Sequence, residues 1–130
     1  MYEYRIKEII KIIDGDTVDV LIDLGFNVFH KERVRLNRID TPETATKDIV
    51  EKNYGLEAKA YVIDWLGKQK QIIIQTYKDD KYGRLLADFY GDNRVCLNDL
   101  LINEGYAWEY DGETKQKNLA LLEAKRKEKL

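Results

Sequence analysis

The alternation of apolar and polar residues predicts short strands in the first half of the chain. Between residues 17 and 24, the apolar positions Val18, Val20 and Ile22 alternate with others, including Asp19 and Asp23. This period of two is typical of a strand with one buried face. The same reading predicts five strands, over residues 4–13, 17–24, 33–39, 71–77 and 85–90. A tight hairpin turn is expected at 14–15 (Asp-Gly), and loops or turns are expected at 25–31 and 79–83.

Helical spacing of apolar residues appears after the third predicted strand. The positions that recur at this spacing are Leu56, Ala60, Ile63 and Leu66. Asn53 can cap such a helix and Gly67 can end it, so the pattern predicts a helix over about residues 54–66. A short second helix is expected from Leu97 to before Gly105, and a third begins at Leu119 and runs into the charged C-terminal segment.

The order of these elements indicates a fold class. Five short strands, with one helix before the last two, are typical of a five-stranded OB-type barrel, and the extra helices pack at its end. The fold expected is therefore α+β, mainly β, with three helices. A length of 130 residues is that of one ordinary domain, so residues 1–130 are expected to form a single domain.

Cysteine and histidine content limits the chemistry. The chain has one cysteine and one histidine, which excludes an internal disulfide and a Cys/His zinc cluster. Any metal ion must therefore be held by oxygen. The N-terminus enters strand-like sequence without an apolar signal-peptide core, so the chain as written is expected to be cytoplasmic, or secreted if it is a trimmed mature form. No membrane association is expected.

The net charge does not by itself favour nucleic-acid binding. With 22 basic and 24 acidic residues the formal charge is −2, whereas proteins that hold polyanions by overall attraction are usually basic. However, Lys and Arg cluster in HKERVRLNR, KDDKYGR and EAKRKEKL. Nucleic acid therefore remains a candidate partner.

Acidic residues gather around the single proline of the chain. In RIDTPET, Pro42 fixes the backbone, Asp40 and Glu43 lie on either side, and Thr41 is favoured in an extended conformation. Asp16 lies in the same register as Val18 and is expected to point toward the mouth of the barrel. Carboxylates and backbone carbonyls are ligands that Ca²⁺ prefers. A calcium site is one interpretation of these residues; an ordinary turn is the other.

Two arginines complete the candidate chemistry. Arg35 lies in the third predicted strand and Arg84 at the head of the fifth. A planar guanidinium suits bidentate contact with phosphate oxygens, although either arginine alone could be a solvated strand residue. Arginines, carboxylates and an oxygen-bound cation at one end of a barrel are the groups needed to cleave a phosphodiester.

Five segments in order resemble the staphylococcal (micrococcal) nuclease family over almost the whole chain: IIDGDTVDV, RVRLNRIDTPET, YGLEAKAY, DDKYGRLLADFY and LNDLLINEGYAW. The resemblance implies an OB-fold, Ca²⁺-dependent endonuclease that acts on DNA and RNA and leaves 3′-phosphate and 5′-hydroxyl ends. It implies that Asp16 and Asp40 bind Ca²⁺ through their carboxylates and Thr41 through its carbonyl. Arg35 and Arg84 would bind the attacked phosphate.

The resemblance assigns four more residues. Glu43 would activate the attacking water, Lys81 and Tyr82 would contact a terminal phosphate of bound nucleotide, and Tyr110 would pack against a base. Single strands are the expected substrates, and the expected state is a monomer. The loop after Glu43 carries both basic and acidic residues, so binding is expected to be weak and sensitive to salt.

An alternative function is a non-catalytic OB-fold module that binds single-stranded nucleic acid or a protein partner. None of the residues assigned to the nuclease site is missing, which favours the enzyme. Phe26 and Phe29 lie in the long second hairpin and are either core, a base-stacking platform or a partner contact. His30 is not expected to be catalytic, and Cys96 is expected to pack as a small apolar residue.

Overall fold

Five strands form the centre of the molecule. The computed structural model describes residues 2–77, 83–111 and 118–128. The strands close into a barrel in the order β1 (Tyr2–Asp14), β2 (Thr17–Asp23), β3 (Phe29–Leu36), β6 (Leu85–Tyr90) and β5 (Ile73–Tyr77). All neighbours pair antiparallel except β3 and β6, which are parallel. The predicted five-stranded barrel of an α+β, mainly β, fold is confirmed.

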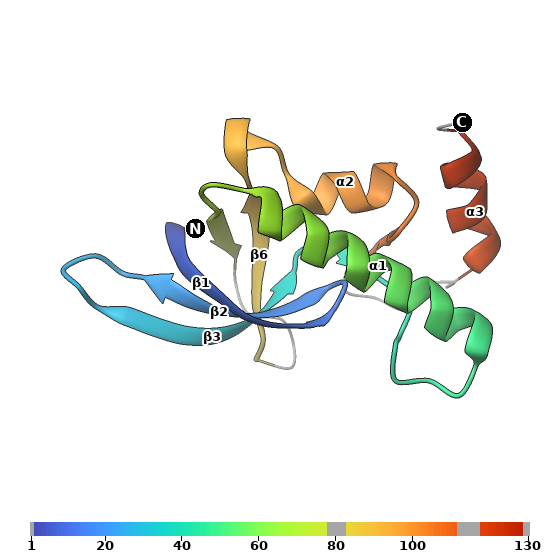
Figure 1. Cartoon of the computed structure of the whole chain (residues 1–130), viewed down its shortest axis with the longest axis horizontal. Coiled ribbons are helices and arrows are strands. Elements are labelled where there is room, and N and C mark those ends of the chain that lie inside the picture. Colours follow the sequence, from blue (N-terminus) through green and yellow to red (C-terminus); the bar gives the residue numbers. More distant parts are fainter. Residues whose placement is uncertain (1, 78–82, 112–117, 129–130) are drawn as a thin grey trace.

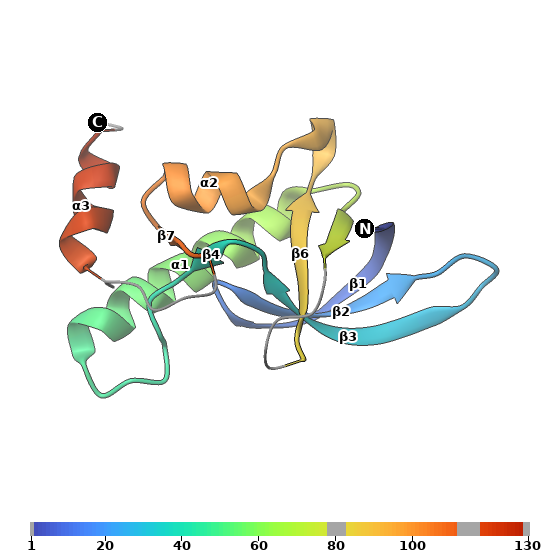
Figure 2. The same cartoon turned by 180° about the vertical axis from the view of Figure 1, so that it is seen from behind.

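The remaining elements surround this barrel (Figures 1 and 2). They are the helices α1 (Ile49–Lys68), α2 (Leu97–Asn103) and α3 (Leu119–Lys127), the 3-10 helix η1 (Asp92–Arg94), and the short paired strands β4 (Ile39–Asp40) and β7 (Trp108–Glu109). Helix α1 packs against β1, and α2 packs against β6. Helix α3 lies beyond the N-terminal part of α1, and the β2–β3 hairpin projects at the opposite end. No described helix combines the length and apolarity needed to cross a membrane.

The inward face of the barrel follows the predicted alternation. Val18, Val20 and Ile22 of β2 are buried, and so are Ile74 of β5 and Phe89 of β6. Their side chains fill the interior from opposite walls, because alternate residues of a strand point to the same face. The apolar pattern of the sequence therefore identified the core of the barrel correctly.

The third predicted strand is wrong in its extent. The chain leaves the barrel after Leu36, and Arg38 adopts a left-handed conformation with φ 64°. The next two residues, Ile39 and Asp40, form β4, which pairs with β7 instead of with the barrel. A single residue with positive φ breaks a strand, and sequence alternation alone does not reveal it.

The first loop is also shorter than predicted. β3 begins at Phe29, so only residues 24–28 connect it to β2, and Gly25, Phe26 and Asn27 all have positive φ. The Phe26 side chain is fully exposed and Phe29 is 43% exposed. The interpretation of these two phenylalanines as core is therefore wrong. His30 lies on the same exposed hairpin, with Nε2 2.7 Å from Glu32 Oε2.

Helix α1 begins and ends outside its predicted bounds. Asp48, and not Asn53, is the N-cap: its carboxylate accepts hydrogen bonds from the backbone N–H groups of Val50 and Glu51. The helix passes through Gly67 and ends at Lys68. An aspartate followed by apolar residues is a good N-terminal signal, but the weakly apolar turn that follows hid it from the periodicity.

The buried face of α1 differs from the predicted one. Its buried residues are Gly55, Ala58, Val62 and Leu66. Of the predicted face only Leu66 is buried, whereas Leu56 and Ile63 are about half exposed at 45% and 51%. Small residues form much of the true contact face, so apolar size misled the prediction. The second and third helices lie where the sequence predicted them, and Trp108 is buried while Trp65 is half-buried.

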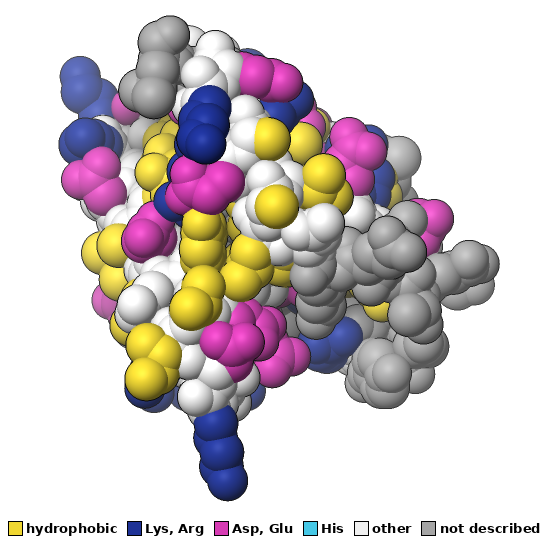
Figure 3. Space-filling model, turned by 90° about the vertical axis from the view of Figure 1, so that its right-hand side faces the viewer, with side chains coloured by type: hydrophobic (Ala, Val, Ile, Leu, Met, Phe, Trp, Pro, Cys, Tyr) yellow, Lys and Arg dark blue, Asp and Glu magenta, His cyan; other side chains and the backbone are white. Residues whose placement is uncertain are grey.

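Charged and apolar side chains are interspersed on the end of the molecule where α1 begins and α3 lies (Figure 3). Exposed apolar residues there include Ile49 and Val50 at the start of α1 and Leu121 in α3. The described part of this face carries acidic and basic groups together, in keeping with the mixed loop between Glu43 and α1.

Candidate active site

Arg35 joins two carboxylates that are far apart in the sequence. It lies in β3 and its side chain is almost fully buried. Its Nη2 atom is 3.2 Å from Asp40 Oδ1 and 3.6 Å from Asp16 Oδ2, and its Nη1 donates to the Ile39 carbonyl at 2.9 Å. Three of the predicted site residues therefore meet at one point on the wall of the barrel.

Asp16 connects the first hairpin to the loop that carries Asp40. It lies in the turn between β1 and β2, where Thr17 Oγ1 donates to its Oδ1 at 2.9 Å. The backbone N–H of Thr41 donates to its Oδ2 at 3.2 Å. Asp16 and Asp40 are 8% and 7% exposed, so both carboxylates are held in place by protein contacts and not by solvent.

The charges and orphan atoms of this cluster fit a hard cation. Two buried carboxylates face one guanidinium, which leaves an excess of negative charge where burial of charge is costly. The hydroxyl oxygen of Thr41 is buried and has no hydrogen-bond partner. Carboxylates with a neighbouring carbonyl are a suitable oxygen set for Ca²⁺. Elsewhere in the described ranges, no three His, Cys, Asp or Glu side chains are grouped to hold a metal ion.

Helix α1 supports both loops of the site through glycines. A Cβ atom built on Gly55 would lie 2.7 Å from the carbonyl oxygens of Pro42 and Glu43. A Cβ on Gly15 would lie 3.0 Å from Ala58 of the same helix and from Thr41. The helix can therefore approach the loops closely only because these positions lack side chains. Sequence analysis missed Gly55; its signal was a glycine in a helical interior, where glycine costs about 1 kcal/mol relative to alanine.

Glu43 lies at the rim of the cluster. Its side chain is exposed, and its backbone N–H donates to Glu51 Oε2 at 3.5 Å, on the first turn of α1. The structure therefore brings Glu43 onto the same loop as Asp40 and Thr41. Its role as a base stays a prediction.

Arg84 lies beside the site on the neighbouring strand. It is half-buried and directly precedes β6, in which Leu86 pairs with Arg35. Because strand residues two apart point to the same face, extension of β6 by one residue places Arg84 on the same face as Arg35. Lys81 and Tyr82, predicted to contact a terminal phosphate, lie outside the described residues.

Tyr110 packs against the central arginine. The guanidinium carbon of Arg35 is 5.3 Å from the centre of the Tyr110 ring, within the range of a cation–π contact. The Tyr110 backbone N–H donates to the Arg38 carbonyl at 2.8 Å and extends the β4–β7 pairing. Tyr110, predicted to pack against a base, is thus brought beside the predicted phosphate ligand.

Asn98 is a supporting residue that the sequence did not reveal. It is 1% exposed, and its Nδ2 donates to the carbonyl oxygens of Asn37 and Ala87 at 3.0 and 3.1 Å. Its Oδ1 accepts from the Phe89 backbone N–H at 3.0 Å. These bonds tie the end of β3 to β6 and so fix the turn between Arg35 and Asp40. In the sequence it resembles an ordinary polar residue of a short helix.

Several pKa shifts occur outside the carboxylate cluster. A hydrogen bond from Arg33, opposed in part by desolvation, lowers the pKa of Asp19 on the neighbouring part of the barrel. Burial, together with a hydrogen bond to Asp88, raises the pKa of Tyr77 to about 12. Burial also raises the pKa of the free thiol of Cys96, which keeps it in its neutral form and agrees with a packing role.

Comparison with known proteins gives a family match. The profile of the family described as staphylococcal nuclease homologue matches residues 33–130. A micrococcal nuclease of Shigella flexneri is 31% identical over 111 residues, covering 79% of this chain and 57% of that protein. A probable staphylococcal-like nuclease of Oryza sativa subsp. japonica is 33% identical over 93 residues, covering 72% and 26%.

An uncharacterized protein of Bacillus anthracis is 36% identical over 101 residues, covering 76% of this chain and 44% of that protein. The chain thus spans about a quarter to under three fifths of the length of these three relatives, from 26% to 57%. The family match begins at residue 33 and includes Arg35, Asp40 and Arg84, whereas Asp16 precedes it. The contact of Asp16 with Arg35 is therefore an observation independent of that match.

Proposed function

The chain belongs to the staphylococcal nuclease homologue family, and we propose that it is a calcium-dependent nuclease that hydrolyses phosphodiester bonds of DNA and RNA. The observation that carries this proposal is the single buried guanidinium of Arg35, which lies 3.2 Å from Asp40 and 3.6 Å from Asp16. A buried arginine beside two carboxylates is suited to hold a phosphate next to a bound cation.

In the proposed site, Asp16, Asp40 and the Thr41 carbonyl hold the calcium ion. When bound, the ion supplies positive charge that neutralises the phosphate and the developing charge of the transition state. Arg35 and Arg84 donate hydrogen bonds to the phosphate oxygens and stabilise the pentacoordinate phosphorane.

Glu43 accepts a proton from the attacking water. The water oxygen forms a bond to phosphorus, and the bond from phosphorus to the 5′-oxygen breaks. The leaving 5′-oxygen takes up a proton, so the products are a 3′-phosphate and a 5′-hydroxyl end. Lys81 and Tyr82 contact a terminal phosphate in this proposal, and Tyr110 packs against a base.

We infer that single strands are the preferred substrates and that the protein acts as a monomer. The formal charge of −2 gives little overall attraction for a duplex. Stacking of unpaired bases on an aromatic ring such as Tyr110 does not require a basic surface. Binding and turnover should fall steeply as salt concentration rises.

The test is cleavage of a labelled single-stranded oligonucleotide in calcium and in a calcium chelator, with chemical identification of the new ends. We expect cleavage only with calcium, with 3′-phosphate ends. Arg33→Ala is the matched control for Arg35→Ala, because Arg33 is an exposed arginine of the same strand that pairs with Asp19. Absence of calcium-dependent cleavage at micromolar protein would refute the proposal.

The alternative function is a non-catalytic module that binds single-stranded nucleic acid or a protein partner, and the net negative charge favours it. It predicts binding that survives the chelator and the Arg84→Ala change, without product. The same oligonucleotide assay, read by binding and by cleavage, separates the two functions.

A further inference from the structure

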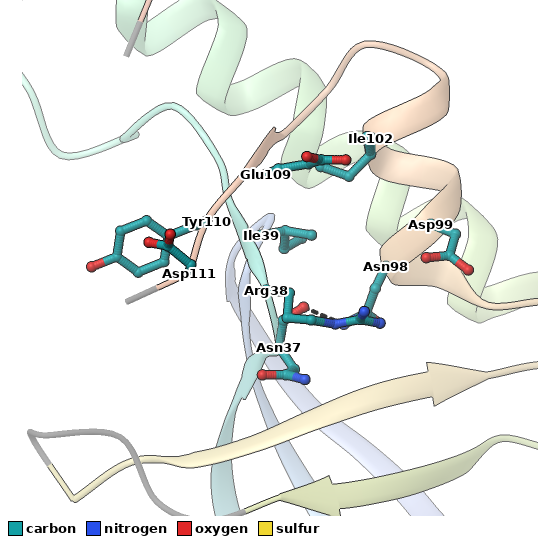
Figure 4. A pocket seen from close by; sticks show the side chains of 9 residues that line it. All are labelled: Asn37, Arg38, Ile39, Asn98, Asp99, Ile102, Glu109, Tyr110 and Asp111. Carbon is teal, nitrogen blue, oxygen red and sulfur yellow. Dashed lines mark hydrogen bonds between the residues drawn. The ribbon is translucent and has the colours of Figure 1, made fainter. Parts of the chain in front are cut away.

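A cavity of about 340 Å³ lies beside the proposed active site. Its walls are the turn at residues 37–39, helix α2 and residues 109–111 (Figure 4). A volume of this size is within the range of small-molecule pockets. The catalytic proposal does not use it.

The cavity combines one arginine with carboxylates on apolar walls. Arg38 enters from the turn, Asp99 from α2 and Glu109 from β7, while Ile39 and Ile102 provide apolar surface. In Figure 4 the Arg38 side chain extends from the turn toward α2, and Glu109 lies next to Ile39 and Ile102. A polar pattern of donor and acceptors on apolar walls is typical of a site that reads a flat, polar-edged ligand.

Asp88 orients Arg38 from below. Asp88 is almost completely buried, and its Oδ2 is 3.7 Å from Arg38 Nη2, whereas 65% of the Arg38 side chain is exposed. The left-handed backbone of Arg38, φ 64°, directs its carbonyl to the N–H of Tyr110. The guanidinium is therefore held at one edge and exposed elsewhere, which is suitable for a planar ligand contact.

The cavity is continuous with the catalytic cluster through Tyr110. Tyr110 contributes to the cavity wall, and its ring centre lies 5.3 Å from the guanidinium carbon of Arg35. A nucleotide whose phosphate is bound by Arg35 therefore has its neighbouring base within reach of this cavity. Duplex DNA would not present an unstacked base here, but a single strand would.

We propose that this cavity is a nucleobase subsite that favours guanine over thymine and uracil, an inference that rests on the proposed nuclease function. Guanine presents the acceptors O6 and N7, which arginine contacts in a bidentate manner, and it carries amino and imino N–H donors for a carboxylate. Thymine and uracil lack the amino group. Arg38 and Glu109 are therefore specificity-determining residues, and Asp99 adds a second acceptor.

The first experiment measures binding of the four nucleoside 5′-monophosphates to the purified protein by calorimetric or NMR titration. Guanosine monophosphate is expected to bind at least about fivefold more tightly than thymidine monophosphate, the lower end of discrimination by one bidentate base contact. Glu109→Gln and Arg38→Lys should each reduce this ratio to below about twofold.

The matched control is Arg94→Ala. Arg94 is also an exposed arginine paired with one carboxylate, Glu3 at 3.3 Å, but it lies outside the cavity. The control should keep the preference of the unmodified protein. Equal binding of the four nucleotides, or a preference that Glu109→Gln and Arg38→Lys leave unchanged, overturns the subsite.

The second experiment maps cleavage in oligothymidylates that carry a single guanine. Cleavage next to guanine should exceed cleavage between thymines at least about fivefold, and Glu109→Gln should remove the difference. Uniform cleavage refutes the subsite and leaves the nuclease function intact. A guanine preference in binding without any cleavage refutes the nuclease function and leaves the subsite intact.

Discussion

Replacement of Gly55 by alanine tests whether helix α1 positions the catalytic loop. The added Cβ atom would lie 2.7 Å from the carbonyl oxygens of Pro42 and Glu43, whereas ordinary contacts begin at 3.4 Å. The loop or the helix must therefore move by roughly 0.7 Å. The contacted atoms are backbone, so no side-chain rotation can relieve the overlap.

Two opposing terms set the stability of Gly55→Ala. Alanine in a helix interior stabilises the folded state by about 1 kcal/mol relative to glycine. Overpacking against backbone costs about 1–3 kcal/mol. The net change expected is a loss of up to about 2 kcal/mol in the free energy of unfolding. Because the displaced loop carries Glu43, turnover should fall by roughly 10- to 100-fold, since errors of about 1 Å cost up to 10²-fold.

Gly67→Ala is the matched control on the same helix. A Cβ atom at Gly67 has no neighbour within 4 Å, so this change adds only the helix preference. We expect it to raise the free energy of unfolding by up to about 1 kcal/mol, with turnover within about twofold of the unmodified enzyme. Urea unfolding and calcium-dependent oligonucleotide cleavage measure both quantities. If Gly55→Ala were as stable and as active as Gly67→Ala, the support of the loop by α1 would be refuted.

Three further predictions concern the site and its surroundings. Arg35→Ala and Arg84→Ala should each lower turnover by at least about 10²-fold, the scale for removal of one preorganised charge-stabilising donor, whereas Arg33→Ala should keep it within about threefold; equal losses in all three would mean that the arginines are misassigned. Asp40→Asn should raise the calcium concentration for half-maximal activity by at least about tenfold, because a neutral amide is a weaker calcium ligand, and an unchanged calcium titration would contradict its role. Because the pKa of Tyr77 is raised to about 12 in the folded state from about 10 in the unfolded chain, the neutral phenol stabilises the fold below about pH 10, and this contribution is lost as pH rises toward 12. Urea unfolding at pH 9 and 11.5 should therefore show a smaller loss of stability in Tyr77→Phe than in the unmodified protein, and parallel losses would contradict the assignment.

The candidate residues themselves were visible in the sequence because they are locally marked. The run DTPET joins acids to a rigid proline, and DGDT marks a hairpin turn, so both segments attract attention without any structure. Their contact was not visible: Asp16 and Arg35 meet because β2 pairs with β3, with Thr17 opposite Arg35. Strand pairing depends on register, which is a long-range property.

Supporting residues were missed for a different reason. Asn98 holds the end of β3 through three backbone groups, yet nothing in its neighbourhood of the sequence distinguishes it from a surface residue. Gly55 and Ala58 form the contact face of α1 with the loops, but small residues contribute little to an apolar pattern. Position 38 broke the predicted third strand through a positive φ that arginine rarely adopts.

The sequence by itself determined the strand alternation, the barrel class and the residue types available for catalysis, because these depend on local periodicity and on side-chain chemistry. Only the tertiary structure decided which face of α1 is buried, where β3 ends, and that Asp16, Arg35 and Asp40 share one buried point. The cavity at Arg38 and Glu109 likewise exists only because β4 pairs with β7 and α2 packs beside them. Each of these features depends on contacts between segments distant in the chain, and local sequence patterns carry no record of such contacts.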